Sequence, residues 1–129
     1  MKRTVLLIDD DEEEYELFCH TLEKYNLNVS CIHAWECSRI ENVIKGKEIH
    51  WVFLDFNLPK HNGYECLHQI KKISPLQNVP VYMFSASYIP TETKKLCLEA
   101  GAVMWLNKPD DIRAYFKIFD EIFGSEVQQ

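Results

Sequence analysis

The sequence predicts an α/β domain in which an open, five-stranded parallel sheet lies between two layers of helices. Five short apolar segments alternate with five segments whose apolar residues recur at helical spacing. Strands that alternate with helices form βαβ units, whose right-handed crossovers place helices on both faces of a parallel sheet. Four of the apolar segments also end in polar residues, as expected where strand ends line a binding crevice. We expect the strand order 2-1-3-4-5, with the first and third strands adjacent where the order reverses.

The expected elements follow from local patterns. The strands are Thr4–Ile8, Asn28–Ile32, Trp51–Leu54, Val81–Phe84 and Val103–Leu106. The third strand is apolar throughout, which is typical of a strand covered on both faces. The helices are Glu12–Tyr25, Ser38–Lys45, a third that follows the turn at 59–63 and ends near Lys72, a fourth that begins at Pro90 and ends at Gly101, and Asp110–Phe123.

Particular residues support several of these helices. Asp11 and Glu14 have the spacing of a capping box at the start of the first helix. The fourth helix has an expected inner stripe at Leu96, Cys97 and Ala100. The last helix has the clearest apolar pattern, at Ile112, Tyr115, Phe116, Phe119, Ile122 and Phe123.

Composition limits the class of protein. A chain of 129 residues corresponds to one domain, which we expect to occupy residues 1–129 with no output domain. A composition of 47% hydrophobic and 26% charged residues is typical of a globular fold. No apolar run approaches the ~20 residues of a membrane span, and the N-terminal run is too short for a secretory signal, so we expect a cytoplasmic protein. The net charge of −6 and the scattered basic residues argue against nucleic-acid binding. The five cysteines contain no CxxC and are expected to be free thiols.

Polar residues at the strand ends offer the chemistry of phosphoryl transfer. They are Asp9 and Asp10 after the first strand, Asp55 after the third, Ser85 after the fourth and Lys108 shortly after the fifth. Because the carboxyl ends of parallel strands share one edge of the sheet, we expect these five side chains to converge. Two carboxylates ~4 Å apart repel each other by about 4 kcal/mol at an effective dielectric near 20, so three of them in one crevice need either a cation or raised carboxyl pKa values. Mg²⁺ suits such a set, since it accepts carboxylate, water and phosphate oxygens.

Asp55 is the expected nucleophile of this set. A carboxylate can form an acyl phosphate, provided that positive charge neutralises the incoming phosphoryl oxygens. Lys108 offers an ammonium group and Ser85 a hydroxyl donor. Each residue taken alone also has a plainer interpretation: the acidic run at 9–14 as an exposed surface, Ser85 as a local cap, and Lys108 as a surface residue. Their independent placement at one sheet edge favours a shared site.

The motifs together resemble the receiver domain of two-component response regulators. The resemblance lies in the order of the motifs and in the intervals between them, and it covers essentially the whole chain. The layout is similar to that of the single-domain, chemotaxis-type regulators, which implies a flavodoxin-like fold. The matching strings are Ile8-Asp9-Asp10, Leu54-Asp55-Phe56-Asn57-Leu58-Pro59 with Gly63, Phe84-Ser85-Ala86 and Lys108-Pro109.

The resemblance implies a role for each matching residue. Asp55 would accept the phosphoryl group, and Asp10 and Asp55 would bind Mg²⁺ directly, together with the backbone carbonyl of Asn57. Asp9 would act through a metal-bound water. These implied metal ligands are Asp9, Asp10, Asp55 and Asn57.

The remaining implied roles concern the response to phosphorylation. Lys108 would pair with Asp55 and then with the phosphoryl group. The peptide bond between Lys108 and Pro109 would be cis. Ser85 would move toward the phosphoryl group. Trp105 would change rotamer, although the usual residue at this position is Tyr or Phe and the larger indole can instead stay outward. Ser87 and Asn57 would flank the site and tune the lifetime of the phosphoryl group.

The implied partners are a sensor histidine kinase or a histidine phosphotransfer protein, and a downstream protein target. The target would read the surface formed by the fourth helix, fifth strand and fifth helix.

Other functions are weighed against this one. The first is a receiver-like binding module that no longer takes phosphate. An aspartate-based phosphatase usually needs a second Asp two residues after the nucleophile, and Asn57 cannot transfer a proton there. A flavin carrier shares the layout, but the acidic loop after the first strand would repel a flavin phosphate. A zinc site at Cys31, His33 and Cys37 lacks a fourth ligand.

Overall fold

The computed structural model describes residues 2–26, 28–86 and 88–127, with side chains described as far as residue 124. The strands are β1 (Arg3–Ile8), β2 (Val29–Ala34), β3 (Trp51–Leu54), β4 (Val81–Ser85) and β5 (Met104–Asn107). The helices are α1 (Glu12–Tyr25), α2 (Ile40–Val43), α3 (Gly63–Ile70), α4 (Thr91–Glu99) and α5 (Ile112–Val127), with short 3₁₀ turns η1 (Cys37–Arg39) and η2 (Ser74–Leu76).

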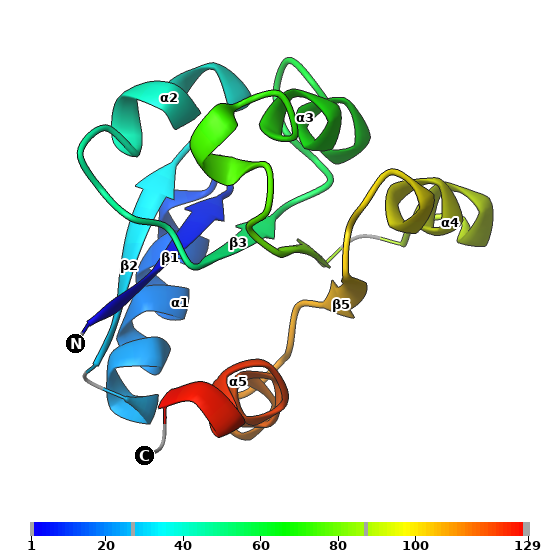
Figure 1. The fold of residues 1–129 in the computed structure, drawn as a ribbon. Coiled ribbons are helices and arrows are strands. Elements are labelled where there is room, and N and C mark those ends of the chain that lie inside the picture. Colours follow the sequence, from blue (N-terminus) through cyan, green and yellow to red (C-terminus); the bar gives the residue numbers. More distant parts are fainter. Residues whose placement is uncertain (1, 27, 87, 128–129) are drawn as a thin grey trace.

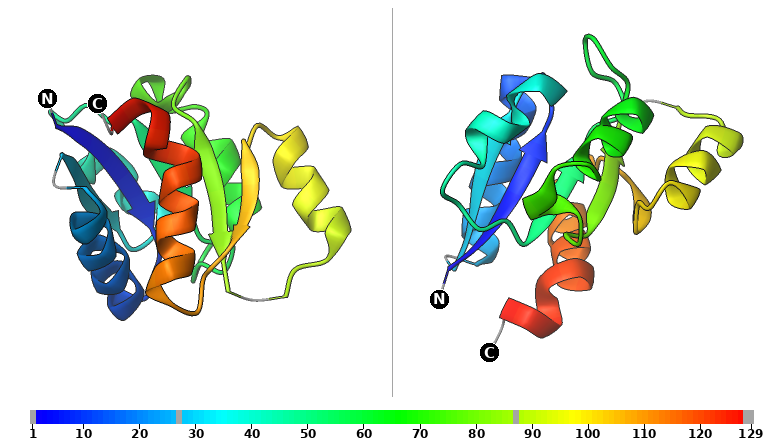
Figure 2. Two further views of the ribbon diagram at one scale, coloured as in Figure 1. Left: turned by 90° about the horizontal axis from the view of Figure 1, so that it is seen from below. Right: turned by 45° about the horizontal axis from the view of Figure 1, so that its top comes forward.

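The expected architecture is confirmed. All five strands are parallel and follow the order β2-β1-β3-β4-β5. Helices α1 and α5 cover one face of the sheet, and α2, α3 and α4 cover the other (Figures 1 and 2). Among the helices of the described segments, none combines the length and the apolar character that crossing a membrane requires.

Strand register brings the ends of β1 and β3 together. Ile8 pairs with Leu54 on one side and with Ala34 on the other. The ladder continues one residue further, since the backbone N–H of Asp55 donates to the Ile8 carbonyl at 2.9 Å. The residues that follow β1 and β3 therefore leave the sheet at the same edge, as the switch-point argument requires.

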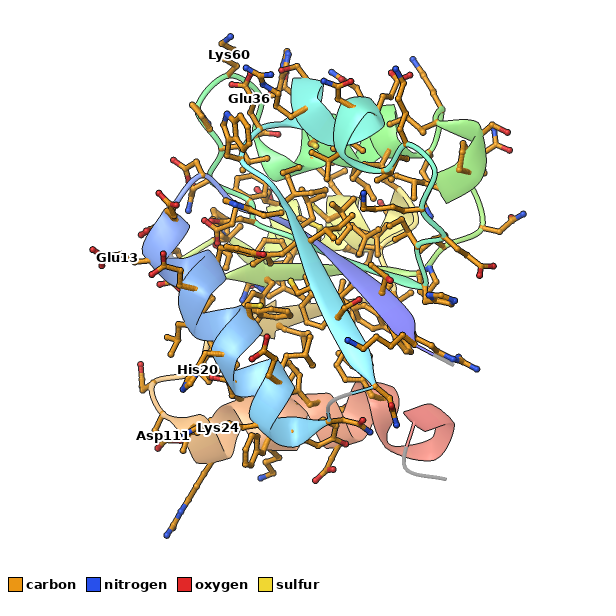
Figure 3. The ribbon with its side chains drawn as sticks, turned by 90° about the vertical axis from the view of Figure 1, so that its left-hand side faces the viewer. Glu13, His20, Lys24, Glu36, Lys60 and Asp111 are labelled. Atoms are coloured by element: carbon orange, nitrogen blue, oxygen red, sulfur yellow. The ribbon has the colours of Figure 1, made fainter. Side chains whose placement is uncertain are left out.

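Two separate apolar cores lie on the two faces of the sheet. The core under α1 and α5 is aromatic, with the ring of Phe18 5.1 Å from Phe53, 5.7 Å from Phe84 and 5.5 Å from Phe119. The core under α2, α3 and α4 is largely aliphatic. Charged residues such as Glu13, Lys24 and Asp111 lie at the surface instead, as Figure 3 shows from the side of α1 and β2. The sheet is thus covered on both faces, which explains its continuous apolar strands.

Helix caps differ partly from the sequence prediction. Asp11 does cap α1, but its side chain accepts from the Glu13 backbone, and no reciprocal bond from Glu14 accompanies it among the described contacts. A complete capping box occurs instead at α3, where Asn62 and Glu65 exchange two bonds of 3.0 Å. Both caps have the extended backbone that an N-cap requires; the difference is that Asn62 accepts from the third residue of its helix, Glu65, whereas Asp11 accepts from the second, Glu13.

Several expected boundaries and burials need correction. The predicted helix at 38–45 is a 3₁₀ turn followed by a single α-helical turn, and β2 continues to Ala34. Leu96 is 48% exposed because it lies one position, about 100° around α4, from the buried Cys97. Ile112 is 44% exposed because it begins α5, before that helix reaches the sheet.

Candidate functional site

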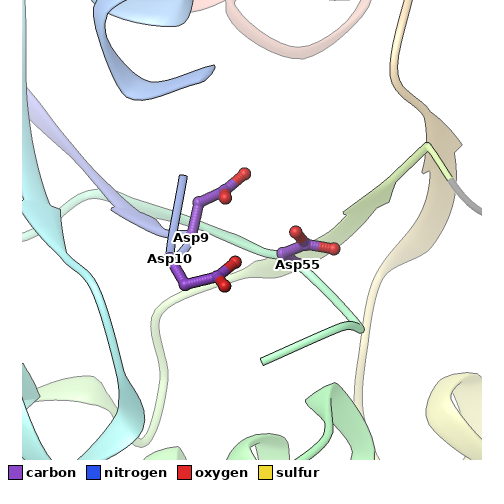
Figure 4. Close-up of side chains that lie close together, drawn as sticks. All are labelled: Asp9, Asp10 and Asp55. Carbon is purple, nitrogen blue, oxygen red and sulfur yellow. The ribbon is translucent and has the colours of Figure 1, made fainter. Parts of the chain in front are cut away.

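Three carboxylates meet at the carboxyl edge of the sheet. Asp9 and Asp10 follow β1, Asp55 follows β3, and one oxygen of each lies within 4.8 Å of the others (Figure 4). Asp9 and Asp55 are buried, at 1% and 6% exposure, whereas Asp10 is exposed. This is an arrangement of hard oxygen ligands with one open side, which a small divalent cation with several waters can occupy.

Lys108 crosses the crevice and pairs with two of these carboxylates. Its Nζ donates to Asp9 Oδ2 at 2.7 Å and to Asp55 Oδ2 at 3.2 Å, with all three side chains at most 8% exposed. The pairing with Asp9 was not foreseen from the sequence. One ammonium group against three carboxylates leaves two negative charges in the crevice, which equals the charge that a divalent cation would neutralise.

Burial and neighbouring charges shift the pKa values of Asp55 and Lys108. Burial raises the pKa of the Asp55 carboxyl; the Lys108 charge opposes this, and the neighbouring Asp9 adds to it. Burial alone would lower the pKa of Lys108, but its hydrogen bond to Asp9 and the charges of Asp55 and Asp9 raise it above its ordinary value. Lys108 is therefore held as a cation, while ionised Asp55 is destabilised until more positive charge arrives.

Backbone contacts fix the position of Asp55. The Asn57 N–H donates to Asp55 Oδ1 at 3.2 Å. Gly63, at the start of α3, lies so close that an added Cβ would meet the Phe56 Cα at 2.7 Å and the Asp55 carbonyl oxygen at 2.9 Å. Only a residue without a side chain fits at this position, so the loop from β3 to α3 packs directly behind Asp55.

Ser85 lies on β4, the strand next to β3, and Trp105 lies on β5, the edge strand beyond β4. Ser85 ends β4 beside the site, since its carbonyl accepts from the Lys108 backbone N–H at 3.0 Å. Trp105, on β5, packs against Phe56 with ring centroids 5.9 Å apart, and Lys94 lies 5.7 Å from the indole ring. Within the described part of the chain, Ser85 Oγ and Trp105 Nε1 are buried polar atoms without a hydrogen-bond partner. Ser87, expected to flank the site, lies outside the described residues.

His33 has a contact that the sequence analysis missed. Its Nε2 lies 2.7 Å from the Asp9 backbone carbonyl, and its ring stacks on Tyr15 at 4.3 Å. The sequence suggested His33 only as a weak zinc ligand. In the described segments the acidic cluster is the one group of potential metal ligands, and it contains no Cys or His. The role of His33 depends on the pairing of β1 with β2, which no local pattern specifies.

The expected cis bond before Pro109 is wrong. No peptide bond of the described residues is cis, so Lys108 and Pro109 are joined in the trans form. That expectation came from the resemblance alone, and an X–Pro bond favours trans by about 0.5–1 kcal/mol unless its surroundings oppose it.

Comparisons with known proteins agree with this fold. The family model of the response regulator receiver domain matches residues 5–119. The two-component response regulator ORR11 of Oryza sativa subsp. indica is 28% identical over 105 residues, which cover 81% of this chain and 70% of that protein. The crystal structure of chemotaxis protein CheY4 from Vibrio cholerae has a TM-score of 0.81 at 21% identity, covering 95% of this chain and 99% of that one. The Mn²⁺-bound form of response regulator Rcp1 has a TM-score of 0.77 at 20% identity, covering 98% and 96%.

The chain is a signalling domain of the α/β class with a parallel sheet and an acidic site at its carboxyl edge. It belongs to the response regulator receiver domain family, whose members act in two-component phosphorelay signalling. The resemblance inferred from the sequence motifs is thereby confirmed.

Proposed function

We propose that this chain is a phosphoacceptor switch in which Asp55 receives a phosphoryl group from a phosphohistidine. The donor is a sensor histidine kinase or a histidine phosphotransfer protein. The observation that supports this most is the convergence of Asp9, Asp10 and Asp55 within 4.8 Å, with Lys108 shared between Asp9 and Asp55. Residues from three strand ends, spread over 100 positions of the chain, supply a nucleophile, a cation and a set of metal ligands at one point.

Mg²⁺ is the proposed cofactor. Asp9, Asp10, Asp55 and the backbone carbonyl of Asn57 would hold it, and the two uncompensated negative charges of the crevice fit a divalent cation. When bound, Mg²⁺ supplies the positive charge that neutralises phosphoryl oxygens. The structure described for Rcp1 is a Mn²⁺-bound form, and this supports divalent-cation binding in the present chain.

The side chains divide the chemistry among them. One Asp55 carboxylate oxygen attacks phosphorus and forms the new P–O bond, while the P–N bond breaks and its electron pair returns to the imidazole nitrogen of the donor. Lys108, already 3.2 Å from Asp55, holds a phosphoryl oxygen by charge. The Ser85 hydroxyl, which is buried without a partner in the described structure, donates to another. A water molecule later attacks the phosphoryl group, which leaves as phosphate and restores the free Asp55 carboxylate.

Phosphorylation would bias the surface of α4, β5 and α5 toward the conformation that a downstream protein binds. Trp105 is placed to take part, because it contacts Phe56 beside the site and Lys94 on α4. Changing the population ratio from 1:99 to 99:1 requires about 5.5 kcal/mol of differential stabilisation. A phosphoryl group that gains contacts with Lys108 and Ser85 in only one conformation is a source of such a difference.

The test is covalent labelling by a small acyl phosphate in the presence of Mg²⁺. Intact mass should rise by one phosphoryl group in the native protein, and Asp55→Asn should abolish the increase. Asp11→Asn is the matched control, since asparagine caps a helix as well as aspartate and Asp11 is not in the proposed site. Labelling that persists in Asp55→Asn would place the acceptor elsewhere, and no labelling of the native protein would favour the phosphorylation-independent binding module.

A further inference from the structure

Two cysteines come together at the edge of the sheet, away from the acidic site. Cys31 lies on β2, the edge strand, and Cys19 lies on α1, which packs over that strand (Figure 3). Both are partly exposed, and both line a cavity of about 170 Å³. The two thiols are close enough to interact electrostatically, and the Cys31 thiol donates to the Ile32 carbonyl at 3.7 Å. The pair is therefore close in space and open to a small solute.

Tyr15 completes this group and makes the two thiols unequal. One turn before Cys19 on α1, its hydroxyl donates to the Cys31 carbonyl at 3.5 Å and lies near the Cys19 thiol. The neighbouring Cys31 thiol, aided by Tyr15 and opposed by burial and by Glu23, lowers the pKa of the Cys19 thiol to about 7. The pKa of Cys31 is raised by the neighbouring Cys19 thiol and by the partial burial of its own side chain. This difference favours Cys19 as the nucleophile and Cys31 as the thiol that keeps its proton.

We propose that Cys19 and Cys31 form an oxidation site for hydroperoxides, in which Cys19 reacts first and Cys31 then closes an intramolecular disulfide between α1 and β2. This property is independent of the proposed function of Asp55, because neither thiol touches the acidic cluster. Reversible thiol oxidation needs a reactive thiol that is oxidised first and a second thiol beside it that then forms the disulfide.

The reaction balances with a hydroperoxide as the only oxidant. The Cys19 thiolate attacks the terminal peroxide oxygen, the O–O bond breaks, and a sulfenic acid forms as the other oxygen leaves and takes up a proton. Cys31 then loses its proton and attacks the Cys19 sulfur, which forms the S–S bond and releases water. Two thiols are oxidised by two electrons, and the peroxide is reduced to an alcohol and water, or to two waters if it is hydrogen peroxide.

The other cysteines provide an internal comparison. Cys37 also lies against Cys66, since its thiol donates to the Cys66 backbone carbonyl at 4.0 Å, but the two residues are 7% and 0% exposed, and Cys97 is fully buried. Access of the oxidant therefore favours Cys19 over all three.

The experiment treats the reduced native protein with one equivalent of hydrogen peroxide. Titratable thiols should fall from five to three, and a peptide map without reductant should link Cys19 to Cys31. Digestion must include cleavage after Glu36, because Cys31 and Cys37 otherwise share a tryptic peptide. In Cys31→Ser the disulfide should be absent and a sulfenic-acid trap should label Cys19, whereas Cys97→Ser should behave as native. Five remaining thiols, a Cys37–Cys66 link formed first, or a link between two chains would each overturn the proposal.

Discussion

Replacing Lys108 by alanine tests the electrostatic account of the site most directly. The change removes the ammonium group that lies 2.7 Å from Asp9 and 3.2 Å from Asp55, in a crevice where these side chains are at most 8% exposed. Two buried carboxylates are then left without their cation, and Asp10 remains beside them.

The size of the effect follows from these distances. At an effective dielectric near 20, each contact contributes about 5 to 6 kcal/mol of Coulomb attraction. Desolvation of the three groups offsets much of this, and removing one partner of a buried pair typically costs about 3 to 5 kcal/mol. At about 4 °C per kcal/mol for a domain of this size, the midpoint of thermal unfolding in a metal-free buffer should fall by roughly 12 to 20 °C.

Mg²⁺ should reverse part of this loss. Lys108 occupies carboxylate oxygens that a cation would use, so the variant offers three unpaired carboxylates and should bind Mg²⁺ more tightly than the native protein. A ligand at 100 times its dissociation constant stabilises the folded state by about 2.7 kcal/mol. The rise in Tm on adding Mg²⁺ should therefore be larger for Lys108→Ala than for the native chain, although the variant can no longer hold the phosphoryl group.

Thermal unfolding followed by circular dichroism, with chelator and then with Mg²⁺, measures both effects. Lys60→Ala is the matched control, because Lys60 is 73% exposed and its contact with Glu36 is long, at 3.9 Å (Figure 3). An exposed ion pair contributes little, so this variant should unfold at nearly the native temperature. A Lys108→Ala midpoint within a few degrees of the native one, or a Mg²⁺ response no larger than the native response, would refute the reasoning.

Two further predictions concern Asp55 and the loop behind it. Because burial raises the folded-state pKa of Asp55, the metal-free native protein loses stability as the pH rises through that value, whereas Asp55→Asn does not. The stability advantage of Asp55→Asn in urea unfolding should thus be smallest below about pH 3.9, the ordinary carboxyl pKa, and should grow toward neutral pH; an advantage that shrinks with rising pH would contradict this. Gly63→Ala should cost about 1 to 3 kcal/mol or more, because its Cβ would clash with backbone atoms of Phe56 and Asp55. Gly124→Ala, which meets nothing within 4 Å in a helix, should instead stabilise by about 0.5 to 1 kcal/mol, and equal effects of the two changes in the same unfolding assay would count against the close packing at Gly63.

The fold was largely predictable because its signals are local and repeated. Apolar runs and helical periodicity located all five strands and the five main helices to within a few residues, with the second helix overestimated. Shorter-range details were less certain. The capping box was expected at Asp11 and found at Asn62, because a box depends on which backbone N–H the cap side chain bonds as well as on residue spacing.

The candidate site was predictable in membership but not in connectivity. Parallel strands end at one edge, so the polar residues after them had to be neighbours. Which carboxylate Lys108 contacts was not available from that argument, and neither was the bond from His33 to the Asp9 carbonyl. The trans bond before Pro109 and the partial burial of Trp105 also depend on surrounding packing.

By itself, the amino-acid sequence determined the succession of elements and the residues that end each strand, since these depend on neighbours only a few positions apart. Tertiary structure alone decided how those residues pair: the bond from Lys108 to Asp9 joins positions 99 residues apart, and the thiols of Cys19 and Cys31 meet only where α1 packs over β2. Such contacts follow from strand register and from the angle at which a helix lies on the sheet. These quantities are set by the packing of the whole core, and no short segment encodes them.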